Sequence, residues 1–157
     1  MKTLKIVAGI VPAIVAVAVT GTSVANAPVA AATGELPITS EVPTLDELND
    51  QIDFLIELPG SDEAKAAQME GGMRAVVVAR TLYNLGWYRA PLGSNDITGP
   101  ETHNGNVHTA KLISKSVGKP TLQATVVWKR IDGAWKLSNS SVCEGVRAVG
   151  LPMGCDF

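Results

Sequence analysis

Apolar residues recur with helical spacing between residues 44 and 56. Leu45, Leu48, Ile52, Leu55 and Ile56 fall on one face of a helix. Thr44 and Glu47 have the spacing of a capping box at its start, and Pro59-Gly60 ends the pattern. We predict a helix that begins at Thr44 and buries this apolar face.

Two further helices are predicted before residue 86. Ser61 is positioned to cap a short helix that runs to about Met69 and stops at Gly71-Gly72. The segment from Met73 to Leu85 has apolar residues at helical spacing and Gly86 at the expected end. Its β-branched run, Val76 to Val78, would also suit a strand, but the spacing favours a helix.

The pattern changes to β after Gly86. Residues Trp87 to Ile97 read as an edge or bent strand, because Pro91 and Gly93 interrupt them. Thr98 to Gly105 is rich in turn residues and predicts a loop. Val107 to Val117 predicts a second strand.

The clearest strand signal runs from Thr121 to Ile131, where apolar and polar residues alternate, and Asp132-Gly133 then predicts a tight hairpin. A two-residue turn would place Trp128 and Trp135 in one core. It would also set Arg130 opposite Trp135, as a candidate cation–π pair. A three-residue turn with a bulge at Gly133 would shift this pairing.

The order of elements predicts the fold class. Helices come first and an antiparallel meander follows, with a last helical turn between Val142 and Val149. This order is typical of an α+β domain in which N-terminal helices pack on one face of the sheet. We expect the first and third helices to cover that face.

The first residues have the layout of a secretory signal peptide. Lys2 and Lys5 precede an apolar run from Ile6 to Val19, and small residues follow. The run is shorter than the roughly 20 residues of a membrane span, so we favour a cleaved leader over an uncleaved anchor. We therefore assign 1–32 to a signal peptide cleaved near 27–32, 33–43 to a flexible lead-in, and 44–157 to a single α+β domain. The protein is expected to be secreted, in the extracellular space or at the cell envelope, with no membrane span once the leader is removed.

Charge is unevenly distributed along the chain. Residues 33–63 hold nine of the fifteen acidic residues and neither lysine nor arginine. After leader removal, eleven basic and fifteen acidic residues remain, so 11 − 15 gives a net charge of −4. We read the acidic run as a solvated helix face lying over the domain's own basic side, with an arm for a basic partner as the alternative. The sequence has no basic stripe with interleaved aromatic residues, so we expect no nucleic-acid binding.

Cys143 and Cys155 are the two cysteines of the chain. In an exported protein an even pair predicts a disulfide, which would contribute about 3 kcal/mol by closing a short loop. A catalytic thiol or an intermolecular bridge is the alternative.

The candidate chemistry is sparse. His103 and His108 are too weak a pair to predict a metal site, and we expect solvated loop histidines. No nucleophile, phosphate or dinucleotide motif occurs, so we expect no catalytic residue, metal or cofactor. Aromatic residues could line a pocket for an apolar ligand, although they are more often core residues. The candidates for pocket lining are Tyr83, Trp87, Trp128 and Trp135.

Several ordered features resemble a known family. They are Val42-Pro43-Thr44 at the first helix, Lys65 with Glu70-Gly71-Gly72, Leu85-Gly86, and the segment from Gly133 to Ser141. Over roughly Pro43 to Gly150 the chain resembles the C-terminal domain of the low molecular weight secreted antigens of mycobacteria and related actinobacteria. The cysteine pair departs from that family's pattern. The resemblance implies a nuclear-transport-factor-two-like, or cystatin-like, fold, in which a curved antiparallel sheet wraps helices into a cone. It implies no established active site.

The functional hypothesis is a secreted, non-enzymatic protein that binds a partner or a small apolar ligand. The alternative is a cone-pocket enzyme, isomerase-like or cyclase-like, in which Asp96, Tyr83 or His108 points into a cavity. The partner is unknown, and a homodimer through the open sheet face is a further candidate.

Overall fold

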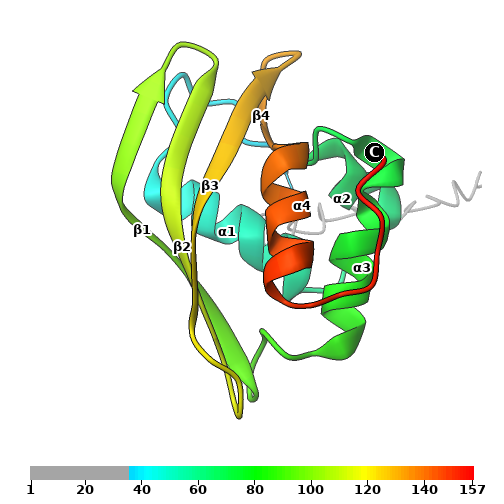
Figure 1. The fold of residues 1–157 in the computed structure, drawn as a ribbon. Helices are drawn as coiled ribbons and strands as arrows, with labels where there is room; N and C mark the ends of the chain where they lie inside the picture. The colour runs from blue at the N-terminus through cyan, green and yellow to red at the C-terminus, as the bar shows by residue number, and fades with distance from the viewer. Residues whose placement is uncertain (1–35) are drawn as a thin grey trace, which may run out of the picture.

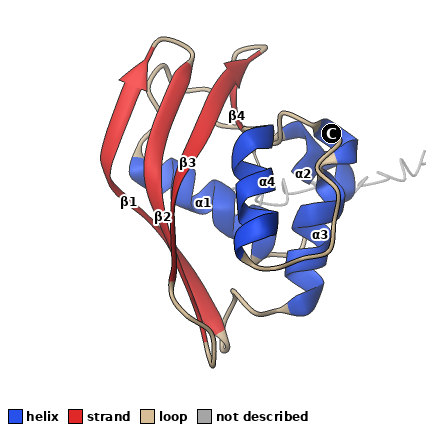
Figure 2. Cartoon of the chain, in the orientation of Figure 1, coloured by secondary structure: helices blue, strands red, loops and turns tan. Residues whose placement is uncertain are grey.

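The computed structural model describes residues 36–157, so the predicted signal peptide lies outside the described residues. Figure 1 shows helices gathered on one side of a sheet, and Figure 2 shows the same separation by element type. The sheet has four antiparallel strands in the order β1-β2-β3-β4. The predicted α+β class is confirmed.

Helix α1 spans Leu45–Ile56 and begins as predicted. The hydroxyl of Thr44 accepts a hydrogen bond from the backbone N–H of Glu47 at 3.2 Å, and the Glu47 carboxylate accepts from the Thr44 N–H at 2.8 Å. This reciprocal pair completes the capping box.

The next helices are α2 (Asp62–Ala67), capped by Ser61, and α3 (Val76–Leu85). A single 3₁₀ turn, η1 (Gly72–Arg74), occupies the predicted start of the third helix, so α3 begins three residues later than Met73. The helical interpretation of the valine run is confirmed. Gly86 ends α3 in the left-handed region, with φ of 66°, as a C-terminal glycine should.

The strands are β1 (Gly93–Asn104), β2 (Val107–Ser116), β3 (Leu122–Ile131) and β4 (Ala134–Leu137). The loop predicted for Thr98 to Gly105 is wrong over most of its length, because β1 continues to Asn104. A register shift between Thr98 and Thr102 accommodates the Gly99-Pro100 pair while pairing with β2 resumes beyond it. Long-range pairing therefore overrides the local turn signal.

The β3–β4 hairpin has the predicted two-residue turn. Ile131 pairs with Ala134, and Asp132 and Gly133 both have positive φ, at 53° and 80°. The three-residue alternative is excluded. Arg130 does lie opposite Trp135, but its guanidinium is directed to the carbonyl of Thr39 at 3.5 Å. The cation–π contacts within residues 36–157 are made by Lys65, Arg89 and Lys119.

The helices that cover the sheet are α1 and α4 (Asn139–Ala148), while α3 packs behind α1 (Figure 1). The expectation that the third helix would cover the sheet is therefore wrong. Ser138 caps α4 through the N–H of Ser141 at 3.2 Å, which lengthens the predicted helical turn to ten residues. This longer helix occupies the place expected for α3.

Both ends of the described chain are attached to the domain. Ile38, expected in a flexible lead-in, is buried, and its carbonyl accepts a hydrogen bond from the N–H of Trp135 at 2.8 Å. At the other end, Leu151, Met153, Cys155 and Phe157 pack in alternation against the helical layer. Within the described part of the chain, no helix is long and apolar enough to cross a membrane.

Candidate apolar ligand site

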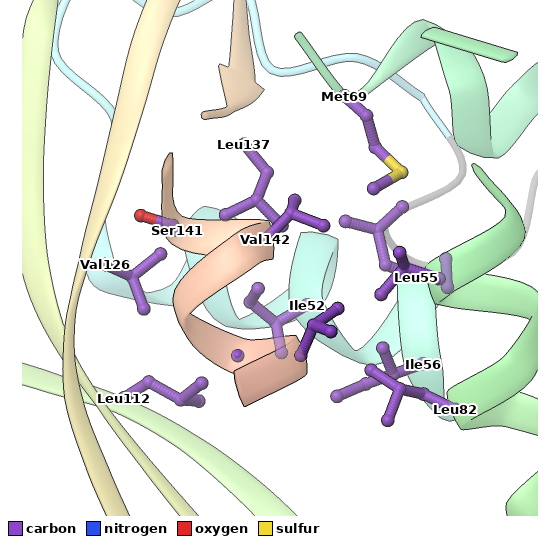
Figure 3. Close-up of a pocket in the computed structure, with 14 residues that line it drawn as sticks. Ile52, Leu55, Ile56, Met69, Leu82, Leu112, Val126, Leu137, Ser141 and Val142 are labelled. Carbon is purple, nitrogen blue, oxygen red and sulfur yellow. The ribbon is translucent and has the colours of Figure 1, made fainter. Parts of the chain in front are cut away.

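An apolar cavity of about 90 Å³ lies between the sheet and the helices (Figure 3). Its walls come from α1, α3, α4 and the inner face of β2 and β3, with further residues from the segment before η1 and the end of β4. The lining residues are Ile52, Leu55, Ile56, Met69, Val78, Ala79, Leu82, Leu112, Val126, Leu137, Ser141, Val142, Gly145 and Val146.

Each helix contributes a stripe one turn long. On α1 the stripe is Ile52, Leu55 and Ile56, at positions i, i+3 and i+4, which share one face of a helix. On α4 the stripe with the same spacing consists of Val142, Gly145 and Val146. A Cβ placed on Gly145 would have no atom within 4 Å, so the missing side chain leaves space at this wall.

The cavity holds no charged side chain. Its one hydroxyl belongs to Ser141, whose Oγ accepts a hydrogen bond from the N–H of Val127 at 2.8 Å. Ser138 Oγ donates to the same oxygen at 3.1 Å. The Ser141 oxygen thus already accepts two hydrogen bonds, and the lining carries no acid or base, so it offers a ligand mainly van der Waals contact.

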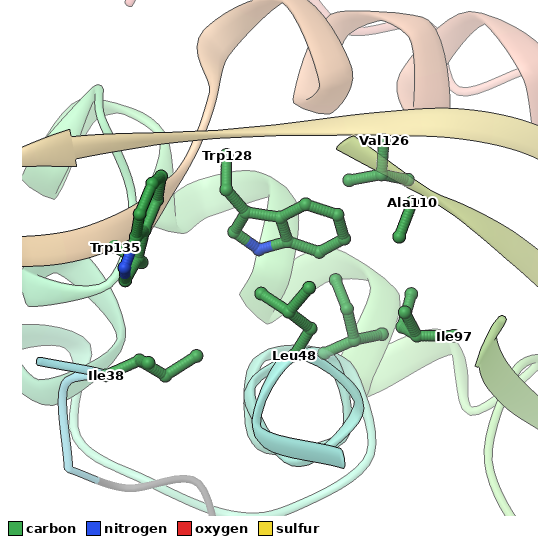
Figure 4. Close-up of a cluster of buried hydrophobic side chains, with 8 residues drawn as sticks. Ile38, Leu48, Ile97, Ala110, Val126, Trp128 and Trp135 are labelled. Carbon is green, nitrogen blue, oxygen red and sulfur yellow. The ribbon is translucent and has the colours of Figure 1, made fainter. Parts of the chain in front are cut away.

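Trp128 and Trp135, named as candidates for pocket lining but expected to share one core, lie in the core. Trp128 and Trp135 are fully buried and pack with Leu48 of α1 and with Ile38 (Figure 4). The indole of Trp128 lies beneath β3 against α1, and that of Trp135 stands beside it (Figure 4). Neither lines the apolar cavity.

Tyr83 and Trp87 also lie away from the cavity, near the end of α3. The Tyr83 ring is half-buried between Lys65 Nζ, 4.8 Å from its centroid, and the Arg89 guanidinium at 4.4 Å. The Trp87 ring lies under Lys119 Nζ at 3.7 Å. Both aromatic rings thus serve as platforms for cations.

The residues proposed for a cone-pocket enzyme are scattered. Asp96 is exposed on β1, beside the start of α1. His108, expected in a solvated loop, is instead buried in β2, because it pairs with Trp128 in β3. Its Nε2 lies 3.2 Å from Glu101 Oε2, but without the geometry of a directed hydrogen bond. Burial lowers the pKa of His108, against the opposing effect of Glu101.

The cysteines are neighbours with free thiols in this structure. Cys143 is buried on α4, and its Sγ lies 3.8 Å from the carbonyl oxygen of Cys155 in the C-terminal segment. Burial raises the pKa of the Cys143 thiol to about 11, and Cys155 adds to the effect. The disulfide stays a prediction. Within residues 36–157, no three His, Cys, Asp or Glu side chains are grouped to hold a metal ion.

Lys65 has a structural role that its sequence position does not reveal. It is 2% exposed, and its ammonium donates to the carbonyls of Leu55 and Leu58 at 3.0 and 2.9 Å. It thereby satisfies free carbonyls at the end of α1. Burial lowers the pKa of Lys65.

Glu70 joins three parts of the fold. Its carboxylate accepts from Lys129 of β3 at 2.8 Å and from the N–H of Asn139, at the start of α4, also at 2.8 Å. Burial opposes the charge, but these hydrogen bonds and the Lys129 cation lower the pKa of Glu70. The next position, Gly71, requires glycine, because a Cβ there would lie 2.8 Å from side-chain atoms of both Ala75 and Asn139. Part of the motif that resembled a family is thus explained by packing.

Asp53 of α1 lies away from the cavity, with Glu57 at the C-terminal cap of the same helix. Asp53 Oδ2 accepts from Asn49 at 3.0 Å, while its buried Oδ1 has no hydrogen-bond partner. Desolvation, together with the charges of Glu57, Asp50 and Asp96, raises the pKa of Asp53 to about 7. Within the described part of the acidic run, Asp62 forms an ion pair with Arg80 at 2.7 Å. That the acidic run lies over the domain's own basic side stays a prediction.

Fold and cavity together define a small α+β domain with an apolar interior site. A family profile described as "Low molecular weight antigen MTB12, C-terminal domain" matches residues 41–153. The chain therefore belongs to the low molecular weight antigen family, as the resemblance implied. No curated protein matches it.

Proposed function

We propose that the protein is exported and acts without catalysis, as a binding module that takes a small apolar ligand between its helices and its sheet. The observation that carries this proposal is the composition of the cavity. All its lining residues are apolar except Ser141, whose hydroxyl oxygen already accepts a hydrogen bond from the backbone of β3. Such a surface favours an aliphatic group over any polar one.

The cavity volume limits the size of the ligand. An engineered apolar cavity of about 150 Å³ stays free of water and binds benzene. The cavity here is smaller, at about 90 Å³, so we infer that it accepts the end of an aliphatic chain rather than a whole drug-sized molecule. The remainder of such a ligand would lie outside the lining described above.

The absence of catalysis is proposed from the position of the candidate residues. A cone-pocket enzyme would need a titratable group facing its substrate. Asp96, Tyr83 and His108 do not line the cavity, and the residues that do carry no acid or base. Export is proposed from the leader pattern and from membership of the antigen family.

The candidate homodimer through the outer sheet face stays a prediction. Lys111 and Lys115 on β2 and Lys136 on β4 alternate with inward-facing residues, so they point to that face. Two copies related by a twofold axis would bring these like charges together. Sedimentation over a range of protein concentrations tests for the dimer.

The ligand proposal is tested by nuclear magnetic resonance on isotope-labelled protein titrated with a medium-chain fatty acid. We expect the methyl signals of Val78, Leu82 and Val146 to shift together, because these groups line the cavity. Val42, which is 49% exposed and lies before α1, serves as the control and should not move with them. Uniformly small shifts, or shifts at Val42 alone, would contradict the proposal.

A further inference from the structure

One end of the sheet forms a projecting tip. Two segments build it: Trp87–Gly93, which enters β1, and Val117–Thr121, which joins β2 to β3. They are held together by the N–H of Val117, which donates to the carbonyl of Leu92 at 2.8 Å. In Figure 1 this end extends below the helical layer, at the bottom of the view.

The tip exposes large apolar side chains side by side. Val117 is 75% exposed and Leu92 is 47% exposed, and Pro91 and Pro120 next to them are exposed as well. Single exposed apolar residues are ordinary on protein surfaces. Here, however, Leu92 and Val117 are joined by a backbone hydrogen bond at the end of the sheet. The Trp87 ring of the same tip lies under Lys119.

The same tip is cationic in an acidic protein. The stretches 85–95 and 114–123 contain Arg89, Lys115 and Lys119 and no acidic residue, whereas the whole chain has a net charge of −2. Two acids adjoin this tip at Asn95: Asp96, which follows it in β1, and Glu57. The Glu57 carboxylate is bound to Asn95, through its N–H at 3.2 Å and its side-chain amide at 2.7 Å.

We propose that this tip docks the protein on an anionic phospholipid bilayer. Lysine and arginine near a bilayer are attracted by anionic headgroups, and tryptophan is favoured at the interface. Leu92 and Val117 would enter the boundary between headgroups and acyl chains, as apolar residues of peripheral proteins do. Arg89, Lys115 and Lys119 would remain at the level of the phosphates. The proposal uses none of the cavity-lining residues, so it can fail while the proposed ligand site stands.

The experiment is vesicle co-sedimentation. The protein is recovered after expression of the full chain, and mass spectrometry verifies that wild type and variants share one N-terminus. The vesicles are phosphatidylcholine alone or phosphatidylcholine with about a third phosphatidylglycerol, a composition that makes the surface strongly anionic. We expect binding to the anionic vesicles that weakens at high salt, because charges at the surface are screened.

Two sets of variants locate the binding surface. Lys115→Gln with Lys119→Gln should weaken binding on the order of fivefold for each lysine removed. Val117→Asp, at an exposed position, should abolish it. The matched control is Lys111→Gln with Lys136→Gln, which removes the same charge from the sheet outside the tip and should bind almost as wild type.

Three results would overturn the proposal. One is equal binding to neutral and anionic vesicles, or none to either. Another is an equal loss in the tip pair and the control pair, which would indicate a diffuse charge effect. The last is concentration-dependent self-association that Val117→Asp removes while vesicle binding is absent, which would assign the tip to a second copy of the chain. Circular dichroism of each variant verifies that the fold is retained.

Discussion

The indole nitrogen of Trp128 donates a hydrogen bond to the side-chain oxygen of Gln51 across 2.8 Å, and both side chains are completely buried. The amide nitrogen of Gln51 donates in turn to the backbone carbonyl of Trp135 at 3.0 Å. A single amide on α1 therefore satisfies groups on both strands of the β3–β4 hairpin. These two bonds fix how α1 lies across the sheet, because a rotated helix would leave buried polar groups unpaired.

Gln51→Leu should lower the free energy of unfolding by about 2–4 kcal/mol, since it leaves a buried indole N–H and a buried carbonyl without partners. Urea unfolding followed by tryptophan fluorescence measures the effect. Adding Trp128→Phe to Gln51→Leu removes the indole N–H that the first change leaves without a partner. The double variant should therefore lose less than the sum of the two single changes, and strict additivity would contradict the coupling.

Asp53→Asn should stabilise the protein at neutral and alkaline pH. The pKa of Asp53 is raised from 3.8 to about 7 on folding, so the folded state binds the proton more tightly than the unfolded chain does. The stability from this group is complete below about pH 4 and is lost as the pH rises through 7. The gain from the variant should therefore be near zero at about pH 4 and about 1–2 kcal/mol at about pH 8, allowing for solvent screening.

Thermal unfolding at several pH values checks this dependence. Asp46→Asn is the matched control, because it removes the same charge from an exposed position in the first turn of α1. An equal gain in both variants would indicate a general charge effect. A gain from Asp53→Asn that did not grow with pH would contradict the raised pKa.

Much of the fold follows from local signals in the sequence. The capping box at Thr44 and the Asp132-Gly133 turn each specify backbone geometry within a few residues, and both were predicted correctly. The part of β1 from Thr98 to Asn104 was missed because Gly99-Pro100 signals a turn locally. Only the pairing with β2, which local sequence does not report, shows that β1 continues beyond Pro100.

The site was less predictable, because it depends on which elements meet. The two-residue turn correctly predicted that Trp128 and Trp135 share a core, but nothing in the sequence indicated that Gln51 would bind both of them. The apolar stripe of α4 would have indicated the real wall, but the sequence predicted only a final turn there. Burial of Lys65 and His108 likewise depends on contacts between distant elements, which composition and spacing do not report.

The predicted disulfide has a direct chemical test. After expression into an oxidising compartment, the mass of the protein should be two hydrogen atoms below that of the reduced form. It should run as a monomer without reductant, because Cys143 and Cys155 are already neighbours. Cys155→Ser should then lower the free energy of unfolding by about 3 kcal/mol. Alkylation of both thiols in unreduced, unfolded protein would show that no bridge forms.

Gly145→Ala should stabilise α4. Glycine in the interior of a helix costs about 0.5–1 kcal/mol relative to alanine, and the new methyl group would meet no atom within 4 Å. Denaturant unfolding should show a higher midpoint with an unchanged slope. A lower midpoint would mean that the space beside Gly145 is not free.

The same position gives the most direct test of the ligand site. Gly145→Leu places a large apolar side chain at the cavity wall, while Gly145→Ala controls for the change in helix propensity. The measurement is displacement of a fluorescent polyene fatty acid by a medium-chain fatty acid, with wild type and both variants at equal concentration. The proposed function predicts saturable binding to wild type and Gly145→Ala, and at least about tenfold weaker binding to Gly145→Leu, since a filled cavity loses its apolar contact area. Equal binding to all three proteins, or no binding to the wild type, would contradict the assignment of the cavity as the ligand site.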